Sequence, residues 1–327
     1  MTLRRKTWTP LSFDKVRTTS LFDRTSKVHR DQFARPWQPG GGFREFLAGL
    51  PDILAGSQFT AAVAAICRAL RADRVVLLGM GAHPIKVGLN PVLIDALENG
   101  ILSALALNGA GIIHDVELAL AGRTSEEVAD QLPRGEFGMA GETAAFIHAA
   151  VADGFRTGGV GLGRAVGRRL LARQPPGIDL SLLAAAARLD APVTVHVAIG
   201  TDIIHMHPGM DGAAMGALSY HDFRLFSALV SSLEGGVYIN LGSAVVLPEV
   251  FLKAVSVVTN LGYSLDGITT INMDFQRHYR PQVNVTDRPT AGRGRGITLI
   301  GHHEIMFPLL LAAVKKRLSE EDIRRKN

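Results

Sequence analysis

The sequence has very little cysteine: its 327 residues contain only Cys67, which lies in an apolar run at positions 61–70. A single cysteine excludes an intramolecular disulfide and is typical of proteins in a reducing compartment, so we expect a cytoplasmic protein. The apolar neighbours of Cys67 indicate a buried thiol rather than a nucleophile. The first residues, MTLRRKTWTP, are basic but lack the apolar stretch of a secretory signal, so we expect no such signal.

Long apolar runs and aromatic residues are scarce as well. No run of about 18 uninterrupted apolar residues occurs, so we expect no membrane span. Aromatic residues make up 6% of the chain, and its net charge of +5 is concentrated towards the two ends rather than in a stripe interleaved with aromatics. This distribution is typical of solvated tails, and we expect no nucleic-acid partner. The remaining composition, 47% hydrophobic and 20% charged, is that of an ordinary globular protein.

Two regions differ in character along the chain. Residues 1–45 are polar and end in the stretch RPWQPGGGF, although they also carry Trp8, Phe13 and Phe22. We interpret them as an N-terminal arm that packs on the body or across a subunit boundary. From about residue 46 the pattern is regular, and residues 46–327 are interpreted as a single Rossmann-like catalytic domain.

Apolar strand-like runs alternate with Ala/Leu-rich helical stretches through the second region. Six runs are predicted to be strands, at 74–80, 103–109, 193–199, 236–242, 267–273 and 296–301. Runs that are apolar throughout are typical of strands buried on both faces, so the pattern predicts an α/β fold with a doubly wound, mostly parallel sheet. Thr124 and Glu127 have the spacing of a capping box, which predicts the start of a helix at Thr124.

Polar side chains follow many of the predicted strands. Seven of the 11 histidines come within a few residues of a carboxyl end: His83, His114, His205, His207, His278, His302 and His303. Asp115, Asp202 and Asp274 occupy similar positions. Because the carboxyl ends of parallel strands share one edge, where open α/β sheets bind ligands, we expect these side chains to line one crevice. Imidazoles suit acid/base catalysis because they titrate near neutral pH. The residues expected to be catalytic are His114, Asp202, His205, His207, His302 and His303.

A metal-dependent hydrolase or lyase is an alternative interpretation of the same residues. Two or three imidazoles and a carboxylate suit Zn²⁺ or Fe²⁺, and the divalent metal would activate water or polarise a carbonyl. The candidate ligands are Asp202, His205, His207 and His303, although their spacing matches no tight metal motif. A third interpretation is a non-catalytic binding protein on an enzyme scaffold.

Four stretches of the chain together carry a family resemblance. They read IKVGLNPVLIDALENGILSALALNGAGIIHDVE, FGMAGETAAFI, SLLAAAARLDAPVTVHVAIGTD and MFPLLLAAV. With the order and spacing of the predicted elements, they resemble the deoxyhypusine synthase family from about residue 75 to 315. The resemblance implies a Rossmann-like fold, a homotetramer and an active site at a subunit interface. It also implies NAD, with which that family transiently oxidises spermidine before its butylamine unit passes through an imine on a lysine.

Carried over position by position, the resemblance places three loops along the dinucleotide. Glycines in such loops permit close approach of the backbone to a phosphate. The implied cofactor-binding residues are Gly81, Ala82 and His83, then Asn108, Gly109 and Gly111, and finally Gly242 and Ser243. Asp202 matches an acidic residue near the nicotinamide.

The chain departs from the family at positions that carry its reaction. The segment that holds the family's catalytic lysine reads VTDRPTAGRGRG here, and no lysine occurs between Lys253 and Lys315. Arginine cannot replace it, because arginine stays protonated and forms no imine. His114 and His302 stand where the family has a polyamine-binding glutamate and a ribose-binding aspartate.

These departures indicate an NAD-linked group transfer or elimination on another small molecule, without formation of deoxyhypusine. Lys86 is the only lysine near a predicted crevice loop, and it is open to two interpretations: an imine-forming residue, or a solvated side chain at a helix start. Arg293 and Arg295 are likewise open to a phosphate-binding role or to a structural role in a surface loop.

Overall fold

A single parallel sheet forms the centre of the body. The computed structural model describes the backbone of residues 6–326 and the side chains up to residue 319. Within this part of the chain, six parallel strands pair in the order β3-β2-β1-β4-β5-β6. Their bounds are β1 Val76–Met80, β2 Ala104–Asn108, β3 Val193–His196, β4 Val237–Leu241, β5 Thr269–Asp274 and β6 Arg295–Ile300. The predictions of these strands and of a doubly wound, Rossmann-like parallel sheet are confirmed.

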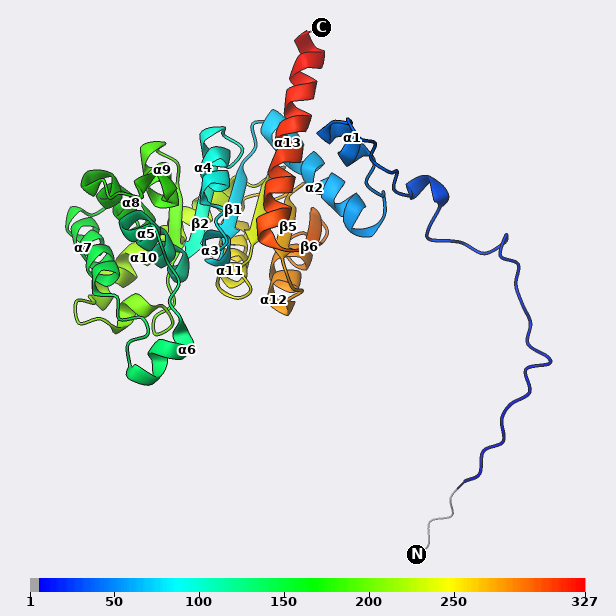
Figure 1. The fold of residues 1–327 in the computed structure, drawn as a ribbon, viewed down its shortest axis with the longest axis horizontal. Helices are drawn as coiled ribbons and strands as arrows, with labels where there is room; N and C mark the ends of the chain where they lie inside the picture. Colours follow the sequence, from blue (N-terminus) through cyan, green and yellow to red (C-terminus); the bar gives the residue numbers. More distant parts are fainter. Residues whose placement is uncertain (1–5, 327) are drawn as a thin grey trace, which may run out of the picture.

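Helices surround this sheet (Figure 1). The α-helices are α1 Phe43–Ala48, α2 Leu54–Arg71, α3 His83–Lys86, α4 Asn90–Glu98, α5 Gly109–Ala121, α6 Val128–Gln131, α7 Gly141–Thr157, α8 Leu162–Arg173, α9 Leu182–Arg188, α10 Gly212–Ser231, α11 Val246–Asn260, α12 Tyr279–Pro281 and α13 His303–Lys326. Shorter turns are η1 Arg30–Gln32, η2 Leu132–Arg134, η3 Ile178–Leu180, η4 Ile203–Met206 and the π-helical η5 Gln282–Asp287. Among the described residues, none of these helices combines the length and apolar character that crossing a membrane requires.

Apolar side chains on both faces of the strands account for the two core layers. In β1, Val76 and Leu78 point into one layer and Leu77 into the other, and all three are buried. Because successive side chains of a strand point to opposite faces, a run that is apolar throughout needs a layer on each side. The first layer includes residues of α2, α4, α5, α8, α9 and α13, and the second draws on α11 and the later turns of α10.

The strand order reverses at β1, which pairs with β2 on one side and with β4 on the other. At the carboxyl end of β1, Met80 lies beside both Leu107 and Leu241. Open α/β sheets bind ligands outside the carboxyl ends of their strands at such a reversal. The helices that follow β1, β4 and β5, namely α3, α11 and α12, lie towards the lower end of the sheet in Figure 1. We call this end the carboxyl edge.

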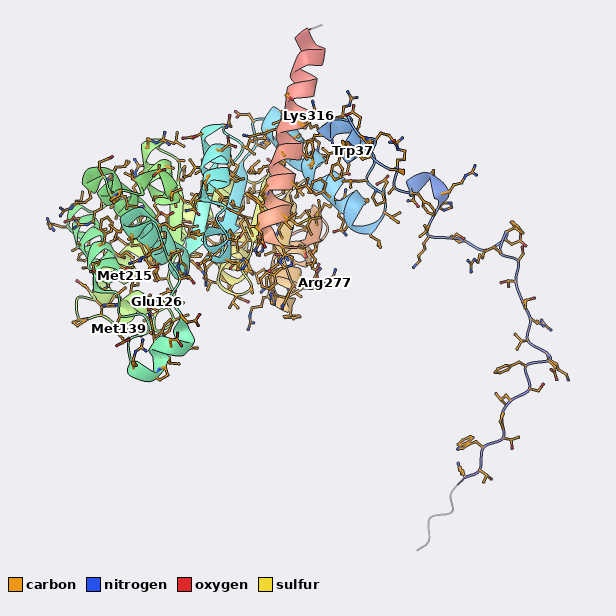
Figure 2. All side chains as sticks on the ribbon, in the orientation of Figure 1. Trp37, Glu126, Met139, Met215, Arg277 and Lys316 are labelled. Carbon is orange, nitrogen blue, oxygen red and sulfur yellow. The ribbon has the colours of Figure 1, made fainter. Side chains whose placement is uncertain are left out.

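The chain before α1 leads away from the body as an extended arm (Figure 1). Trp8, Phe13 and Phe22 are exposed on it, Phe22 to 94%, and Figure 2 shows side chains of the arm standing clear of the body. Close to α1 the arm is held in place, since the amide of Arg35 donates to the carbonyl of Gly49 at 2.9 Å. Several large aromatic groups on an extended segment mark a contact surface, and the packing of the arm across a subunit boundary stays a prediction.

Two buried carboxylates tie helices to one another and to the sheet. Asp222 of α10 accepts hydrogen bonds from the amides of Gly163 (3.0 Å) and Val195 (2.8 Å), which joins α10 to α8 and β3. Burial raises the pKa of Asp222 from 3.8 to about 7, although these two bonds act in the opposite direction. Asp115 of α5 accepts a bond from Ser181 Oγ at 2.6 Å, and burial raises its pKa to about 6. The sequence placed Asp115 at the crevice, but these contacts make it a structural carboxylate beneath α9.

We expect Asp222 to make the fold more stable as the pH falls from about 7 towards about 4. A carboxyl whose pKa is higher in the folded than in the unfolded chain takes up a proton on folding between the two values, so protonation favours the folded state. Asp222→Asn carries no charge and keeps an acceptor oxygen for the two amides. It should therefore unfold at a higher temperature than the wild type at about pH 8, and should lose that advantage at about pH 5. Differential scanning fluorimetry measures both.

Asp211→Asn is the control for this experiment, because Asp211 is an exposed carboxylate that caps the same helix through the amide of Ala214. It should lower stability slightly, and by about the same amount at both pH values. If Asp222→Asn were less stable than the wild type at every pH, a raised pKa of Asp222 would be excluded.

Candidate active site

His83, His303 and Asp274 meet where the strand order reverses. His83 is the first residue of α3, just after β1, and His303 is the first residue of α13, after β6. Their Nδ1 atoms lie 2.8 Å apart, at hydrogen-bond distance. Asp274, the last residue of β5, places its Oδ1 3.8 Å from Nε2 of His303, and the ring of Phe275 contacts both imidazoles. We call these four residues the switch-point cluster.

Burial sets the charge of His303 within this cluster. The side chain of His303 is 0% exposed, so the loss of hydration lowers the pKa of its imidazole, an effect that the nearby Asp274 opposes. His303 is therefore neutral at pH 7. The ring of His83 is less buried than that of His303, with intermediate exposure. His302 points outwards: its side chain is 70% exposed, and its Nδ1 lies 3.8 Å from Glu304. The two adjacent imidazoles, which we expected to line one crevice together, thus separate into a buried ring and an exposed one.

Close packing within the protein explains why glycine occupies positions 81 and 242, in the loops after β1 and β4. A Cβ on Gly81 would overlap the carbonyl oxygen of Gly242, and a Cβ on Gly242 would lie 2.8 Å from the ring of His303. Gly242 also has a φ of +62°, which other residues rarely adopt. The loops after β1 and β4 therefore touch backbone to backbone, with the His303 ring over the second. At these two positions the space of the missing side chain is filled by the chain's own atoms.

Asp202 packs against the first turn of α5. Its carboxylate accepts a hydrogen bond from the amide of Ala198 at 2.8 Å and fills the space that a Cβ of Gly109 would need. Burial raises the pKa of Asp202, although the bond from Ala198 and the neighbouring His205 oppose the shift. Burial also lowers the pKa of His205, whose two ring nitrogens are buried without a hydrogen-bond partner among the described residues. Carboxyl and imidazole are thus both shifted towards their neutral forms.

His207 and His148 fasten the loop that follows β3. Nε2 of His207 lies 2.8 Å from the carbonyl oxygen of Gly138, and Nε2 of His148 lies 2.9 Å from that of Ile204. A carbonyl only accepts, so each ring donates from Nε2. His207 therefore links this loop to the segment before α7, in addition to the catalytic role that the sequence predicts for it.

His114 lies on the second turn of α5 and has two partners. Its Nδ1 is 2.5 Å from Oγ1 of Thr124, and the Thr124 hydroxyl in turn donates to Glu117. The single hydrogen of the hydroxyl is used in that bond, so its oxygen accepts from Nδ1–H of His114. Burial would raise the pKa of Glu117, but the nearby His114, whose Nδ1 lies 3.6 Å from Oε2, and the bond from Thr124 outweigh it, so the pKa lies below the usual value. Since Nδ1 of His114 carries the hydrogen of this bond, Nε2 is the ring nitrogen left to face another partner.

A cavity of about 500 Å³ opens beside this group. Its volume suits a small organic molecule. The residues that line it include Glu117, Leu120, Arg123, Thr124, Ser125, Glu126, Glu142 and Thr143. Glu126, labelled in Figure 2, also holds the segment before α7, because its carboxylate accepts a hydrogen bond from the amide of Gly138 at 3.2 Å. The partners of His114 therefore form part of a cavity wall.

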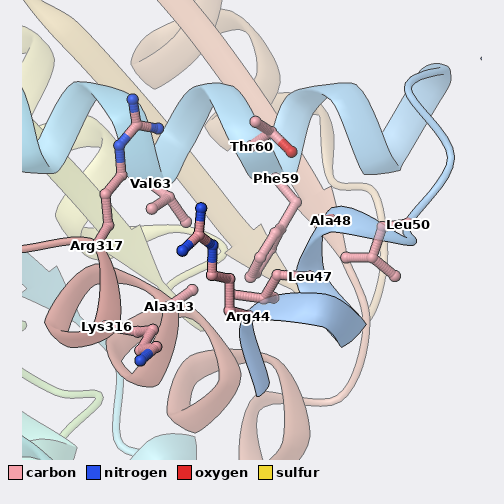
Figure 3. Close-up of a pocket in the computed structure, with 10 residues that line it drawn as sticks. All are labelled: Arg44, Leu47, Ala48, Leu50, Phe59, Thr60, Val63, Ala313, Lys316 and Arg317. Atoms are coloured by element: carbon pink, nitrogen blue, oxygen red, sulfur yellow. The ribbon is translucent and has the colours of Figure 1, made fainter. Parts of the chain in front are cut away.

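A second cavity, of about 270 Å³, lies between α1, α2 and α13 (Figure 3). Leu47, Phe59 and Val63 give it an apolar lining, and Figure 3 shows the guanidinium groups of Arg44 and Arg317 beside it. None of the site residues predicted from the sequence lines this cavity. It belongs to the junction of the arm with the body rather than to the carboxyl edge.

The metal-dependent alternative finds no support in this arrangement. The described residues contain no group of three or more histidine, cysteine or acidic side chains placed to hold a metal ion. Asp202, His205 and His207 follow β3, whereas the ring of His303 lies at the switch point, beside His83 and over the loop after β4.

The other cofactor-binding candidates stand at helix starts. The side chain of Asn108 accepts from the amide of Gly111 at 2.9 Å and caps α5. Ser243 Oγ accepts from the amide of Leu247 at 3.2 Å at the start of α11, and Ala82 precedes α3. Amides at the start of a helix favour phosphate groups, so these residues offer backbone donors at the carboxyl edge.

The three cationic residues left open by the sequence lie at the surface or in a loop. Lys86 is exposed at the end of α3, and Arg295 is exposed at the start of β6. Arg293 donates from Nε to the carbonyl of Pro289 at 2.8 Å and from Nη1 to Thr259 Oγ1 at 3.3 Å. Arg293 therefore holds the loop before β6 against α11.

Sequence reasoning missed the partners of His114. Glu117 lies one helical turn after His114, a spacing that places both on one face of α5, so this signal was present. The predicted helix start at Thr124 is wrong, because α6 begins at Val128 and the Thr124 hydroxyl bonds His114 and Glu117 instead. For Phe275, which contacts the two imidazoles of the switch-point cluster, the sequence offers no signal beyond its position after a strand.

Comparison with known proteins gives matches among solved structures, whereas no protein-family model and no curated protein matches the chain. A "putative deoxyhypusine synthase" from Entamoeba histolytica is 13% identical with a TM-score of 0.52, over 86% of this chain and 95% of that one. The ternary complex of AgrE with ornithine and NAD+ is 14% identical with a TM-score of 0.52, over 82% of this chain and 34% of that one. Unliganded AgrE gives 14% identity and a TM-score of 0.53, over 81% and 34% of the two chains.

The chain shares the fold of these proteins. The resemblance to deoxyhypusine synthases that the sequence suggested is thereby confirmed at the level of the fold. The chain spans about a third of the length of AgrE, but nearly the whole of the Entamoeba protein. At 13–14% identity these similarities establish architecture, and activity has to be inferred from the residues of this chain.

Gly109→Ala tests the packing of Asp202 against α5. The added Cβ would overlap the Asp202 carboxylate, so the helix start must shift or the hydrogen bond to Ala198 must break. We expect the free energy of unfolding to fall by about 1–3 kcal/mol, as for other overpacked sites. Gly216→Ala is the matched control, because it lies inside α10 with no atom within 4 Å of the added Cβ, and it should raise stability by up to about 1 kcal/mol. Denaturant titration compares them, and equal effects would contradict this packing.

Proposed function

We propose that the chain is an enzyme that performs an NAD-linked group transfer or elimination on a small molecule. The switch-point cluster is the observation that carries this proposal. A buried neutral imidazole, a half-buried imidazole and a carboxylate come together at the position where open α/β sheets bind their ligands. Groups of this kind transfer protons at neutral pH, which both reaction types require.

NAD is the cofactor that we propose, on the basis of fold and position. AgrE, which has a similar fold, has been solved in complex with ornithine and NAD+. In this chain the starts of α5 and α11 lie at the carboxyl edge and suit the phosphates of a dinucleotide. The chain's own atoms occupy the space beside Gly81 and Gly242. Binding of the dinucleotide would therefore depend on the backbone amides at the helix starts rather than on open space at these glycines. When bound, NAD would accept a hydride from the substrate.

Three groups of side chains would hold or move protons around the carboxyl edge. The switch-point cluster lies at its centre, and Asp202 with His205 lies beside the start of α5. His114 lies on α5, and its neighbours Thr124 and Glu117 line a cavity. Of the remaining catalytic candidates, His207 orders the loop after β3 and His302 stands at the exposed rim. A small molecule of the size of that cavity is the substrate class we propose.

Deoxyhypusine formation is not part of the proposal. The segment 285–296, where the family carries its imine-forming lysine, contains arginines but no lysine and forms the end of η5 and the loop that leads into β6. Arg293 within it is engaged with Pro289 and Thr259. Lys86 is exposed, so it offers no desolvated amine of the kind that forms an imine.

The purified full-length chain should bind NAD+, seen as heat in isothermal titration calorimetry and as a higher unfolding temperature. His83→Gln removes an imidazole at the loop after β1, so we expect the affinity to fall about tenfold or more, equal to about 1.4 kcal/mol. His221→Gln is the matched control, because it removes an imidazole from the middle of α10, and it should leave the affinity unchanged. If neither NAD+ nor NADH at about 1 mM binds, a limit of about 4 kcal/mol, the NAD-linked reaction is refuted.

We further propose that the chain forms a homotetramer in which the arm of one subunit packs on another. Each large aromatic side chain that becomes buried contributes about 2 kcal/mol, so Trp8, Phe13 and Phe22 together would stabilise such a contact substantially. Light scattering of the full-length chain should therefore show a tetramer, and the double substitution Trp8→Ser with Phe22→Ser should shift it towards smaller species.

Tyr220→Ser is the control for the arm, because Tyr220 is an exposed aromatic residue on the body. It should leave the assembly unchanged. A chain that stays monomeric at concentrations of about 100 μM, where a contact of about 7 kcal/mol would be largely formed, contradicts the proposed packing of the arm.

A further inference from the structure

The hydrogen bond between His83 and His303 can be formed in two ways. Nδ1 of one ring faces Nδ1 of the other at 2.8 Å, so in a neutral pair one ring donates and the other accepts. A neutral imidazole carries a single N–H, and therefore the direction of this bond also decides the state of Nε2 in both rings. Either His83 or His303 is left with a basic Nε2.

Asp274 distinguishes the two arrangements. Its Oδ1 lies 3.8 Å from Nε2 of His303, which is longer than a hydrogen bond but close enough for a strong electrostatic preference inside the protein. Nε2 of His303 is buried and has no hydrogen-bond partner among the described residues. A bare Nε2 would turn its lone pair towards a carboxylate, whereas an N–H there turns a positive hydrogen towards it.

Asp274 has two further polar neighbours. The amide of Phe275 donates to Oδ1 at 2.8 Å, and Nε2 of His278 lies 4.0 Å from Oδ2. The carboxylate is thus flanked by a backbone donor and by the imidazoles of His278 and His303. His303 accordingly keeps its hydrogen on Nε2 and accepts at Nδ1, so His83 donates from its own Nδ1.

We propose that His83 is the catalytic base at the carboxyl edge, with its tautomer fixed by His303 and Asp274 acting as positioning residues. In this arrangement Nε2 of His83 carries a free lone pair on a half-buried ring, and no described residue makes a hydrogen bond to it. The ring of Phe275 at 5.3 Å and the buried ring of His303 hold the plane of the base. This inference rests on the proposed function, because it names the residue that removes the substrate proton.

The step itself is a simple proton transfer. A bond between hydrogen and a substrate atom breaks, its electron pair stays on that atom, and the proton forms a new N–H bond at Nε2 of His83. The ring becomes an imidazolium whose Nδ1–H still donates to His303, while Asp274 on the far side of His303 favours the added positive charge. Return of the proton from Nε2 restores the starting state.

Magic-angle-spinning NMR of the full-length chain with ¹⁵N-labelled histidine tests the tautomers directly, without substrate or cofactor. The measurement is made at about pH 8, above the usual pKa of an imidazole, and the signals are assigned with His83→Gln and His303→Gln. We expect the hydrogen on Nδ1 of His83 and on Nε2 of His303. The inverse assignment, with His303 donating from Nδ1, overturns the proposal whether or not NAD+ binds.

Asp274→Ala separates the effect of the carboxylate from the geometry of the pair. Without it the preference should be lost, so that the Nδ1–H signal of His83 is replaced by signals of both tautomers. Glu304→Ala is the matched control, since it removes an exposed carboxylate next to His303 in the sequence and should leave the tautomers unchanged. Unchanged tautomers in Asp274→Ala contradict the role of Asp274. If that variant does not fold, the wild-type spectrum remains the deciding test.

Discussion

Five pairs of residues align β1 with β4, from Val76 opposite Val237 to Met80 opposite Leu241. This register brings the loops after the two strands into backbone contact at Gly81 and Gly242, and the His303 ring lies over the second loop within reach of His83. A slip of one residue would exchange the faces of every side chain in the strand. The hydrogen-bond ladder between these two strands therefore determines where the imidazoles meet, although neither histidine belongs to it.

The sequence predicts the strands well because their chemistry is local. A run that is apolar at every position suits only a strand covered on both faces, and all six such runs form strands within a few residues of the expected bounds. The same reasoning placed many histidines at one edge of the sheet. Which of them touch could not be predicted, because His83 and His303 are 220 residues apart and their contact depends on the order of the strands.

The direction of adjacent side chains at a helix start is a second feature that the sequence does not predict. His302 and His303 have the same side chain, but successive residues there point in directions about 100° apart, so one ring enters the core and the other faces solvent. The role of a glycine in the sequence is also ambiguous. It is needed wherever something approaches the backbone closely, and the sequence does not say whether that is a phosphate or, as at Gly109, the carboxylate of Asp202.

The contact between Gly242 and His303 also limits how the protein can change. The Cβ of any side chain at position 242 would lie 2.8 Å from the imidazole and would require an unfavourable backbone conformation, as the φ of +62° shows. A smaller residue at position 303 would relieve the collision but leave the strain of the backbone. The two positions are therefore energetically coupled, and in related sequences we expect them to covary, with a histidine at the second position only where the first is glycine.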